Sequence, residues 1–435
     1  MDKSALEGLA KQLPSGAVVT APEEMAPYAT DWTRVPGKPS AVLLPRNVQE
    51  VSLALAYCHA HGIPVVPSGG RTGLAAGAVP TRGEVVLNMS RLDTIAEPSV
   101  LARTLRVGAG AITERVHEKA AEAGLIWPID LASKGSCQIG GNLSTNAGGL
   151  RVIRYGMTRK WVTRLQVVKM DGTILELNAD LEKNNTGYDL LQMVVGSEGT
   201  LCAVTEATLK LAPQPSDRGK AVMLFGLPTA QGVAELFEHC RRGPFEILAF
   251  EFFSDRCLAA VEKQLGRRCR FPDRHAYYAL MEIAGEAPRE EWLAQTLALS
   301  GVRDALQAES SDDRRAVWGL REGITESLAR TGPLRKHDLC VPLRSMASFL
   351  GEVDGIAPRE KLKVDVYFFG HFGDGSPHVN LVNPAGVSFE EFERDCDRYE
   401  VALFDLVKKY SGSISSEHGI GLLKKKWLSY SRTQE

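Results

Sequence analysis

The sequence predicts an α+β fold in two parts, and three observations lead to this class. Short strands and helices alternate from Ser40 onward, and a glycine-rich loop follows the second of these strands. A polar stretch rich in proline, 211–219, then interrupts the pattern. Beyond it, strands alternate with amphipathic helices, which predicts a large antiparallel sheet with helices on one face.

At 435 residues the chain is longer than one hydrophobic core usually supports, so we expect more than one domain. Residues 1–213 form the first, 214–410 the second, and 411–435 a C-terminal segment. The formal net charge of -2 gives no support for nucleic-acid binding. Eight cysteines without a C-x-x-C pair indicate reduced thiols and a cytoplasmic protein. Neither a signal peptide nor a transmembrane segment is indicated, and peripheral membrane contact stays open.

Short apolar runs mark the strands of the first part. After the run at 41–45, Asn47 and Glu50 have the spacing of a capping box, so a helix should begin there. The next strand, 64–67, leads directly into the glycine-rich loop. Further strands are expected at 85–89, 104–108, 165–170 and 173–178.

The second part has longer elements. An amphipathic helix at 229–242 should precede strands at 246–253 and 275–285. A long helix should run from Phe389 to Lys409.

Three loops of small residues in the first part predict an extended cofactor. The segment PSGGRTGLAAGAV (67–79) follows a strand, where backbone N–H groups can close on a pyrophosphate. It has neither the Walker nor the Rossmann spacing, and such a loop alone can equally be a structural turn. Two similar stretches follow at 135–149 and 194–211.

In this order the three loops resemble the FAD domain of flavoproteins of the vanillyl-alcohol oxidase and p-cresol methylhydroxylase type. The resemblance implies a two-part FAD-binding domain and an α+β cap domain with a large antiparallel sheet. It implies that FAD contacts Pro67, Ser68, Gly69, Gly70, Arg71, Thr72, Gly73, Leu74, Pro128, Gly135, Ser136, Gly140, Gly141, Thr145, Gly148, Gly149, Glu198, Gly199 and Val204. Arg71 stands where asparagine is frequent, and it either contacts a phosphate or faces solvent. The loop lacks the histidine that binds flavin covalently in some members, so we expect non-covalent FAD.

Two segments near the C-terminal end, HFGDGSPHVN (371–380) and SSEHGIG (415–421), contain candidate metal ligands. A hairpin would bring His371 and His378 together, although two ordinary strand histidines would fit the same pattern. Glu417 would complete three protein ligands and leave a fourth position for substrate oxygen. These ligands suit zinc, and Mn²⁺, Co²⁺ or Fe²⁺ stays open. His418 is a candidate base.

Both segments resemble those of FAD-dependent, metal-dependent D-2-hydroxyacid dehydrogenases, where a GDG turn separates two histidines and S-x-E-H-G follows later. The resemblance implies that the metal orients and acidifies the substrate hydroxyl, His418 takes its proton, and the C2 hydride passes to flavin N5. Asn380 should lie on the same strand face as His378, within reach of the substrate carboxylate.

We expect Arg321, Thr325 and Lys336 to contact the anionic groups of the substrate. Arg321 and Thr325 lie one turn apart in an expected helix at 315–330, and Lys336 follows a Gly-Pro break. Spacing alone would also fit a solvated helix face. All three match substrate-contacting residues of D-2-hydroxyglutarate dehydrogenases, so the implied reaction oxidises D-2-hydroxyglutarate to 2-oxoglutarate. D-malate, D-lactate and glycolate are the alternative substrates.

The same resemblance implies an electron acceptor such as an electron-transfer flavoprotein or a quinone, rather than NAD, and it allows a homodimer. Similar proteins usually continue past 430–435 with a tail that returns to the flavin, so further cofactor contacts could lie beyond this sequence. Two other classes stay open: a zinc hydrolase without flavin, and a flavin-binding module without catalysis.

Overall fold

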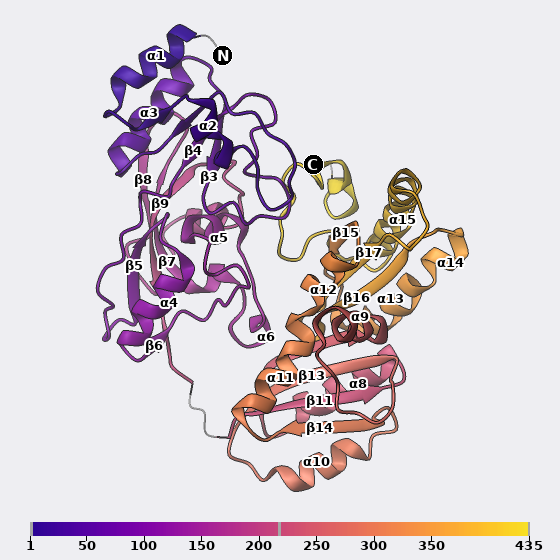
Figure 1. Ribbon diagram of the computed structural model, residues 1–435. Helices are drawn as coiled ribbons and strands as arrows, with labels where there is room; N and C mark the ends of the chain where they lie inside the picture. The colour runs from indigo at the N-terminus through magenta and orange to yellow at the C-terminus, as the bar shows by residue number, and fades with distance from the viewer. Residues whose placement is uncertain (1–2, 216–218, 434–435) are drawn as a thin grey trace. The chain divides into compact units, whose positions relative to one another are not determined.

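The computed structural model describes residues 3–215 and 219–433, which form two compact units (Figure 1). The first unit runs to Arg151, from Tyr155 to Pro215 and from Glu417 to Lys425. The second takes in Val152–Arg154, the chain that follows Pro215 as far as Ser416, and residues from Lys426 onward. Part of the polar stretch 211–219 lies outside the described residues.

The first unit begins with a small sheet of order β1-β2-β4-β3, in which β2, β4 and β3 run parallel. Its strands are β1 (Val18–Val19), β2 (Ala41–Leu43), β3 (Val65–Ser68) and β4 (Val85–Asn88). Helix α3 (Val48–Ala60) connects β2 to β3 and begins as expected, because Asn47 accepts a hydrogen bond from the Glu50 amide. The glycine-rich loop leaves the end of β3.

An antiparallel sheet of order β5-β9-β7-β8 completes this unit, and β10 pairs with β6. The strands are β5 (Thr104–Gly108), β6 (Leu125–Ile126), β7 (Val162–Val168), β8 (Ile174–Leu177), β9 (Ala203–Lys210) and β10 (Ala212–Pro213). The other helical segments in this part of the chain are α1 (Lys3–Gln12), α2 (Pro22–Met25), η1 (Ala26–Tyr28), α4 (Thr113–Glu122), α5 (Ile139–Thr145), α6 (Val152–Tyr155), η2 (Thr158–Trp161) and α7 (Leu190–Val194).

The second unit is built on a seven-stranded antiparallel sheet of order β14-β11-β13-β12-β16-β17-β15. The strands are β11 (Ala221–Leu227), β12 (Glu246–Ser254), β13 (Tyr277–Ala284), β14 (Asp304–Ala308), β15 (Leu334–Asp338), β16 (Asp365–His371) and β17 (Ser376–Val382). The helical segments are α8 (Ala230–Arg242), α9 (Asp255–Leu265), α10 (Arg289–Leu297), α11 (Ser311–Glu322), α12 (Ile324–Thr331), η3 (Leu343–Ser345), α13 (Met346–Asp354), α14 (Ile356–Glu360), η4 (Phe372–Asp374), α15 (Phe389–Lys409) and η5 (Lys425–Tyr430).

Helices cover both faces of this sheet, so the expectation of helices on one face was wrong. Phe237 of α8 packs its ring on Phe250, whereas Phe253 belongs to a core shared with Leu258 of α9 and Val317 of α11. Phe250 and Phe253 point to opposite sides of β12, because side chains alternate along a strand. A strand covered on both faces has a nearly continuous apolar sequence. A search for alternating apolar and polar residues therefore does not detect the second covered face.

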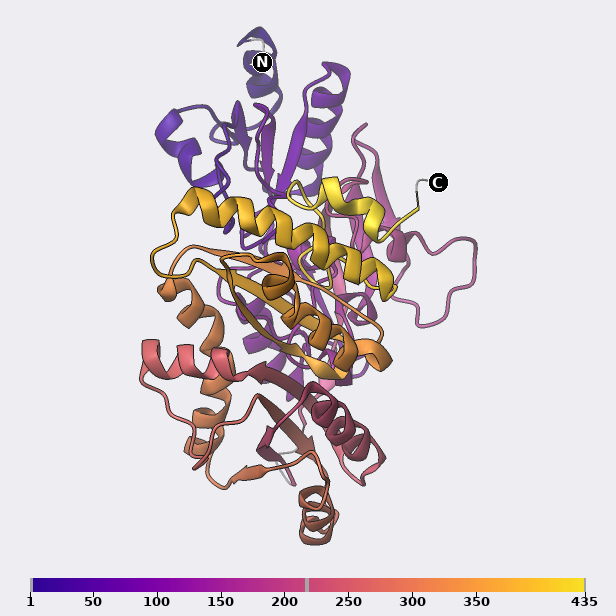
Figure 2. The ribbon, with the colours of Figure 1, turned by 90° about the vertical axis from the view of Figure 1, so that its right-hand side faces the viewer.

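The long helix α15 has the expected bounds, Phe389–Lys409, and the C-terminal turn η5 lies along it (Figure 2). The ring centroids of Phe404 and Trp427 are 4.9 Å apart, which ties the two segments together. Of the described helices, none combines the length and the apolar character that a membrane crossing requires.

Candidate active site

Polar side chains gather on one face of the seven-stranded sheet, where β12, β16, β17 and β15 lie side by side. Opposed residues of paired antiparallel strands share a face. The register places His371 opposite both Glu251 and Ser376. Side chains two residues apart return to the same face, so the expected hairpin puts His378 beside this group. We call the following set the polar face: Glu251, Lys336, Asp338, His371, His378 and Asn380.

The two histidines of the polar face lie close together. The ring centroids of His371 and His378 are 5.3 Å apart and their planes cross at 84°. The turn between the strands requires glycine, because Gly375 has φ +80° and a Cβ there would lie 2.3 Å from the Val341 carbonyl oxygen. Among the described residues, no group of three His, Cys, Asp or Glu side chains is arranged to hold a metal ion.

Glu251 is a buried carboxylate that joins two functional candidates, and the sequence did not reveal it. Its Oε1 atom accepts a hydrogen bond from His371 Nδ1 at 2.7 Å, and its Oε2 atom lies 2.8 Å from Arg321 Nη2. Burial by itself would raise the pKa of Glu251, but the charges of His371 and Arg321 and the hydrogen bond with His371 outweigh it and lower the pKa. Glu251 is therefore an anion.

Asp338 occupies a similar position beside His378 and was also missed from the sequence. The distance between its Oδ1 atom and His378 Nδ1 is 3.7 Å. Its carboxylate accepts from the Ser416 hydroxyl at 2.6 Å and from the Ser416 amide at 3.1 Å, and from the Ser415 hydroxyl at 3.3 Å. Asp338 thus fixes the two residues that directly precede Glu417 and His418.

Three hydrogen-bond donors near the polar face fit an anionic ligand. In the described part of the chain, Asn380 Nδ2 and Arg321 Nε are buried and have no hydrogen-bond partner. Lys336 lies opposite Asn380, and burial lowers the pKa of Lys336 with no acidic neighbour to offset it. Buried donors without partners are costly, so an acceptor from a ligand would stabilise this arrangement.

Arg321 and Thr325 belong to two consecutive helices rather than to one. The expected continuous helix at 315–330 was wrong, because α11 ends at Glu322 and α12 begins at Ile324. Gly323 lies at the break, where a Cβ would meet Leu265 Cδ1 at 2.8 Å. Arg321 is buried and its guanidinium stacks over the Phe369 ring, whereas Thr325 is exposed in the first turn of α12.

In the first unit, the glycine-rich loops pack too closely for side chains at Gly70 and Gly149 and leave open space at Gly141. A Cβ at Gly70 would lie 2.1 Å from the Ser136 carbonyl oxygen, so the first loop packs directly on the second. A Cβ at Gly149 would lie 2.1 Å from the Asp130 carbonyl oxygen. Gly141, in α5, would meet nothing within 4 Å. The loops therefore form a close backbone cradle with an open position at Gly141, as a cofactor diphosphate requires.

Other predicted FAD contacts differ in their surroundings. Ser68 Oγ, at the end of β3, is buried without a hydrogen-bond partner among the described residues, which fits a ligand. Val204 and Pro128 are buried, and Val204 belongs to the apolar core. Arg71 contacts other residues of the protein. Its guanidinium stacks over the Tyr28 ring and donates to the Gly69 carbonyl oxygen at 3.4 Å. Burial lowers the pKa of Arg71.

Glu198 holds the segment that carries Glu417 and His418. Its Oε1 atom accepts from the Ile420 amide at 2.8 Å and its Oε2 atom from the Gly421 amide at 2.7 Å. Glu417 and His418 are assigned to the first unit, so their position relative to the histidines of the polar face stays a prediction. Sequence reasoning named Glu198 only as an expected FAD contact.

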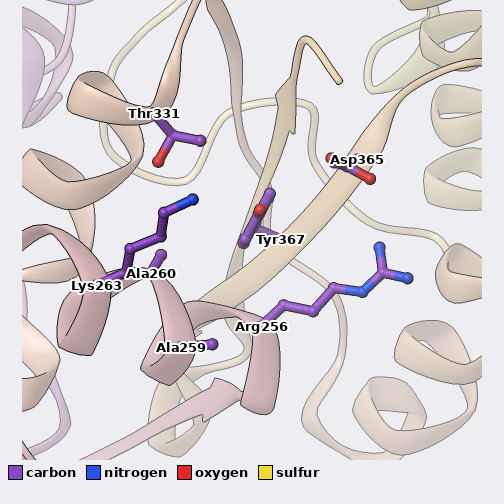
Figure 3. A pocket seen from close by; sticks show the side chains of 7 residues that line it. All are labelled: Arg256, Ala259, Ala260, Lys263, Thr331, Asp365 and Tyr367. Carbon is purple, nitrogen blue, oxygen red and sulfur yellow. The ribbon is translucent and has the colours of Figure 1, made fainter. Parts of the chain in front are cut away.

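A shallow cavity of about 240 Å³ lies in the second unit (Figure 3). Its lining residues are Arg256, Ala259, Ala260, Lys263, Thr331, Asp365 and Tyr367. Tyr367 lies opposite Asn380 in the register of β16 and β17, and directly opposed residues share a face. The cavity therefore borders the polar face at Asn380.

Comparisons with known proteins show the family of the chain. Residues 39–178 match the family described as FAD binding domain, and residues 216–435 match FAD linked oxidases, C-terminal domain. A D-2-hydroxyglutarate dehydrogenase of Xanthomonas citri pv. viticola is 42% identical, with 98% of this chain and 91% of that protein covered. One from Stutzerimonas stutzeri is 38% identical, with 99% and 94% covered.

A solved structure supports the fold. The crystal structure of p-cresol methylhydroxylase with substrate bound matches with a TM-score of 0.73 at 14% identity, covering 98% of this chain and 91% of that one. This likeness confirms the predicted α+β class, with an FAD-binding domain of vanillyl-alcohol oxidase type and a large antiparallel sheet.

Proposed function

Because this chain belongs to the D-2-hydroxyglutarate dehydrogenases of the FAD linked oxidase family, we propose that it oxidises D-2-hydroxyglutarate to 2-oxoglutarate. The chain is an FAD-dependent enzyme that oxidises D-2-hydroxy acids. Our proposal concerns the acid it prefers and the residues that act on it.

The observation that carries the proposed substrate is the set of unsatisfied donors near the polar face. Arg321 and Asn380 each have a buried nitrogen without a partner in the described part of the chain, and Lys336 adds a half-buried ammonium group. An arginine can grip one carboxylate, and a separate lysine can hold another as a point charge. A 2-hydroxy dicarboxylate uses both cations, whereas D-lactate has only one carboxylate. We assign Thr325 to the same substrate, as a contact from α12.

The donor chemistry of the polar face fits a divalent transition metal, which we propose to be zinc. His371 and His378 are adjacent, and Glu251 fixes the hydrogen on His371 Nδ1, as carboxylates do for metal-bound histidines. Glu417 would supply the third ligand. When bound, the metal would orient the substrate hydroxyl and lower its pKa.

His418 is the proposed base for the hydroxyl proton. It follows Glu417 directly, and Asp338 and Glu198 fix the chain on either side of the two residues. This anchoring would hold the imidazole in place without constraining its proton. Asn380 would hydrogen-bond the substrate carboxylate and thereby fix which face of C2 is presented.

FAD, when bound, supplies the oxidant that takes up the C2 hydride. The cradle of Gly70, Gly141 and Gly149 would receive its diphosphate, and Ser68 Oγ would donate to it. The bound FAD is expected to be non-covalent, and the acceptor that reoxidises it to be an electron-transfer flavoprotein or a quinone.

Anaerobic reduction of the flavin tests this function directly. The yellow holoenzyme should bleach with D-2-hydroxyglutarate faster than with D-malate, D-lactate, glycolate or any L-enantiomer. A chelator should abolish bleaching, and added zinc should restore it. A colourless protein would instead indicate a hydrolase, and yellow protein that no 2-hydroxy acid bleaches would indicate a binding module.

Substitution of Lys336 tests the substrate class. Lys336→Ala removes the distal cation, so KM for D-2-hydroxyglutarate should rise about 10- to 100-fold, the worth of a hydrogen bond to a charged group. KM for D-lactate should stay unchanged in the same variant. Unchanged kinetics on every dicarboxylate would show that the enzyme prefers a monocarboxylate.

A further inference from the structure

Glu251 is a buried carboxylate of the polar face, and the proposed function has used only its contact with His371. It lies in the middle of β12, it is 1% exposed, and both neighbours in the chain, Phe250 and Phe252, are buried. A buried ion pair is expensive to desolvate, and apolar side chains often replace one without loss of stability. Packing therefore gives no reason for glutamate at this position.

The two partners of Glu251 come from different parts of the proposed site. His371 is a proposed metal ligand on the neighbouring strand, and Arg321 is a proposed substrate contact at the end of α11. Each carboxylate oxygen serves one of them, at 2.7 Å for His371 Nδ1 and 2.8 Å for Arg321 Nη2. The Arg321–Glu251 pair is an ion pair without good hydrogen-bond geometry, since Oε2 has no aligned donor in the described part of the chain.

Each of these contacts has a chemical consequence. A histidine that donates its Nδ1 hydrogen to a carboxylate carries its lone pair on Nε2, and it becomes a stronger ligand. An arginine held through one Nη atom keeps its other donors in a fixed direction, and Arg321 Nε is among them. The charges of Glu251 and Arg321 also cancel, so neither is left uncompensated in the interior.

We propose that Glu251 is a positioning residue that fixes the tautomer of His371 and the direction of Arg321 at the same time. Metal binding and recognition of the substrate carboxylate then depend on one buried group. This inference rests on the proposed function, because it takes His371 as a ligand and Arg321 as a substrate contact.

Two variants separate the two roles. In Glu251→Gln the side-chain oxygen can still accept from His371, but the amide nitrogen opposes Arg321 donor to donor. KM for D-2-hydroxyglutarate should therefore rise roughly tenfold or more, while zinc affinity changes less. In the double variant Glu251→Leu with Arg321→Met no buried ion remains unpaired, so the fold should persist. His371 loses its acceptor, and zinc affinity should fall about 10- to 100-fold.

A matched control comes from the same sheet. Glu282 in β13 is also buried and pairs with Lys220 at 2.9 Å, outside the polar face. Glu282→Gln should leave both zinc affinity and KM at wild-type values. Zinc affinity is measured on the FAD-loaded enzyme against a series of zinc buffers, and circular dichroism of each variant verifies its fold.

The results distinguish this inference from the proposed function. If wild-type enzyme binds zinc and oxidises D-2-hydroxyglutarate while the folded double variant keeps wild-type zinc affinity, the role of Glu251 is refuted and the function stands. An unchanged KM in Glu251→Gln would refute its role toward Arg321. If the wild-type enzyme itself neither binds zinc nor oxidises the acid, the proposed function fails first.

Discussion

Lys336 carries a half-buried ammonium group whose charge should depend on pH within the alkaline range. Burial lowers the pKa of Lys336 below the ordinary lysine value of about 10.4. The side chain is therefore charged below its lowered pKa and becomes neutral as pH rises through it. Since the proposed role requires the charge, dicarboxylate binding should weaken on the alkaline side before an exposed lysine would titrate.

The pH dependence of KM checks this expectation. KM for D-2-hydroxyglutarate should rise at a pH below the ordinary lysine pKa of about 10.4, because the distal cation is lost there. In Lys336→Arg the rise should move to higher pH, since a guanidinium group stays charged. D-lactate is the control, with a KM that does not follow this titration. A dicarboxylate KM that is flat across the same range would contradict the role of Lys336.

At the scale of single elements, the short helix α5 contains Gly141, and packing within the protein does not require glycine there. A Cβ at Gly141 would meet nothing within 4 Å, although glycine weakens a helix. Gly70, in the neighbouring loop, differs because the Ser136 carbonyl oxygen leaves no room for a side chain. The structure therefore separates a glycine required by the fold from one that a bound group would require.

Alanine at these two positions should act differently. Gly141→Ala should keep the apoprotein stable or stabilise it by up to ~1 kcal/mol, while FAD affinity falls about tenfold or more, ~1.4 kcal/mol. Gly70→Ala should lower both the stability and the flavin content. The measurements are chemical unfolding of apoprotein and FAD titration. Gly351→Ala, at an open position in α13, is the control and should leave FAD affinity unchanged. Wild-type FAD affinity in Gly141→Ala would exclude the cofactor from this position.

Glu198 anchors a loop rather than a regular element, and its backbone is unusual. It adopts φ +54°, a conformation that residues other than glycine rarely take. Two charge-assisted hydrogen bonds to the Ile420 and Gly421 amides accompany this conformation. Such bonds contribute about 1.5–3 kcal/mol each, so Glu198 holds the chain that follows His418, as Asp338 holds the chain before Glu417.

Removal of that carboxylate should loosen the segment. In Glu198→Ala, hydrogen exchange of the Ile420 and Gly421 amides should accelerate at least about tenfold, and kcat should fall. Glu206→Ala is a suitable control, because Glu206 forms ion pairs with Arg106 and Arg164 and none with the segment. If exchange of the two amides is unchanged in Glu198→Ala, another contact holds this segment.

Local signals in the sequence predicted several elements well. The Asn47 cap of α3, the hairpin of β16 and β17, and the full length of α15 all follow from capping, turn and periodicity rules. The hairpin register also places Asn380 on the same face as His378. These features depend on residues that are near each other in the chain, so short-range patterns contain the information.

The parts that sequence reasoning missed depend on distant partners. Glu251 and His371 are separated by 120 positions, and the run EILAFEFF shows only a strand with a charge in it. A charged residue flanked by phenylalanines is a usable signal of a buried ion pair, but it does not name the partner. Coverage of both sheet faces likewise depends on how α8 and α11 pack on the sheet. The sequence of a single strand does not contain this information.

At the scale of the whole molecule, all eight cysteines are free thiols. Five of them are buried, and Cys202, Cys269 and Cys340 are partly accessible. Burial raises the pKa of Cys58 to about 11 and that of Cys240 to about 12, so thiolate is scarce at neutral pH.

Thiol titration should follow this division. Native enzyme at neutral pH should react slowly at no more than the three partly accessible thiols, and all eight should react in denaturant. The measurement is the stoichiometry of labelling with mass spectrometric assignment. Rapid labelling of Cys58 or Cys240 in native protein would contradict the packing described for either unit.

The way the chain passes between units has a consequence for how the enzyme is made. Residues 417–425 belong to the first unit but follow nearly the whole second unit in the sequence. A ribosome therefore delivers the amides that Glu198 binds only after the second unit has emerged, although domains usually fold in order from the N-terminus. The first unit cannot be completed until residues 417–425 have been synthesised. We therefore expect stable FAD binding after synthesis of the chain rather than during it.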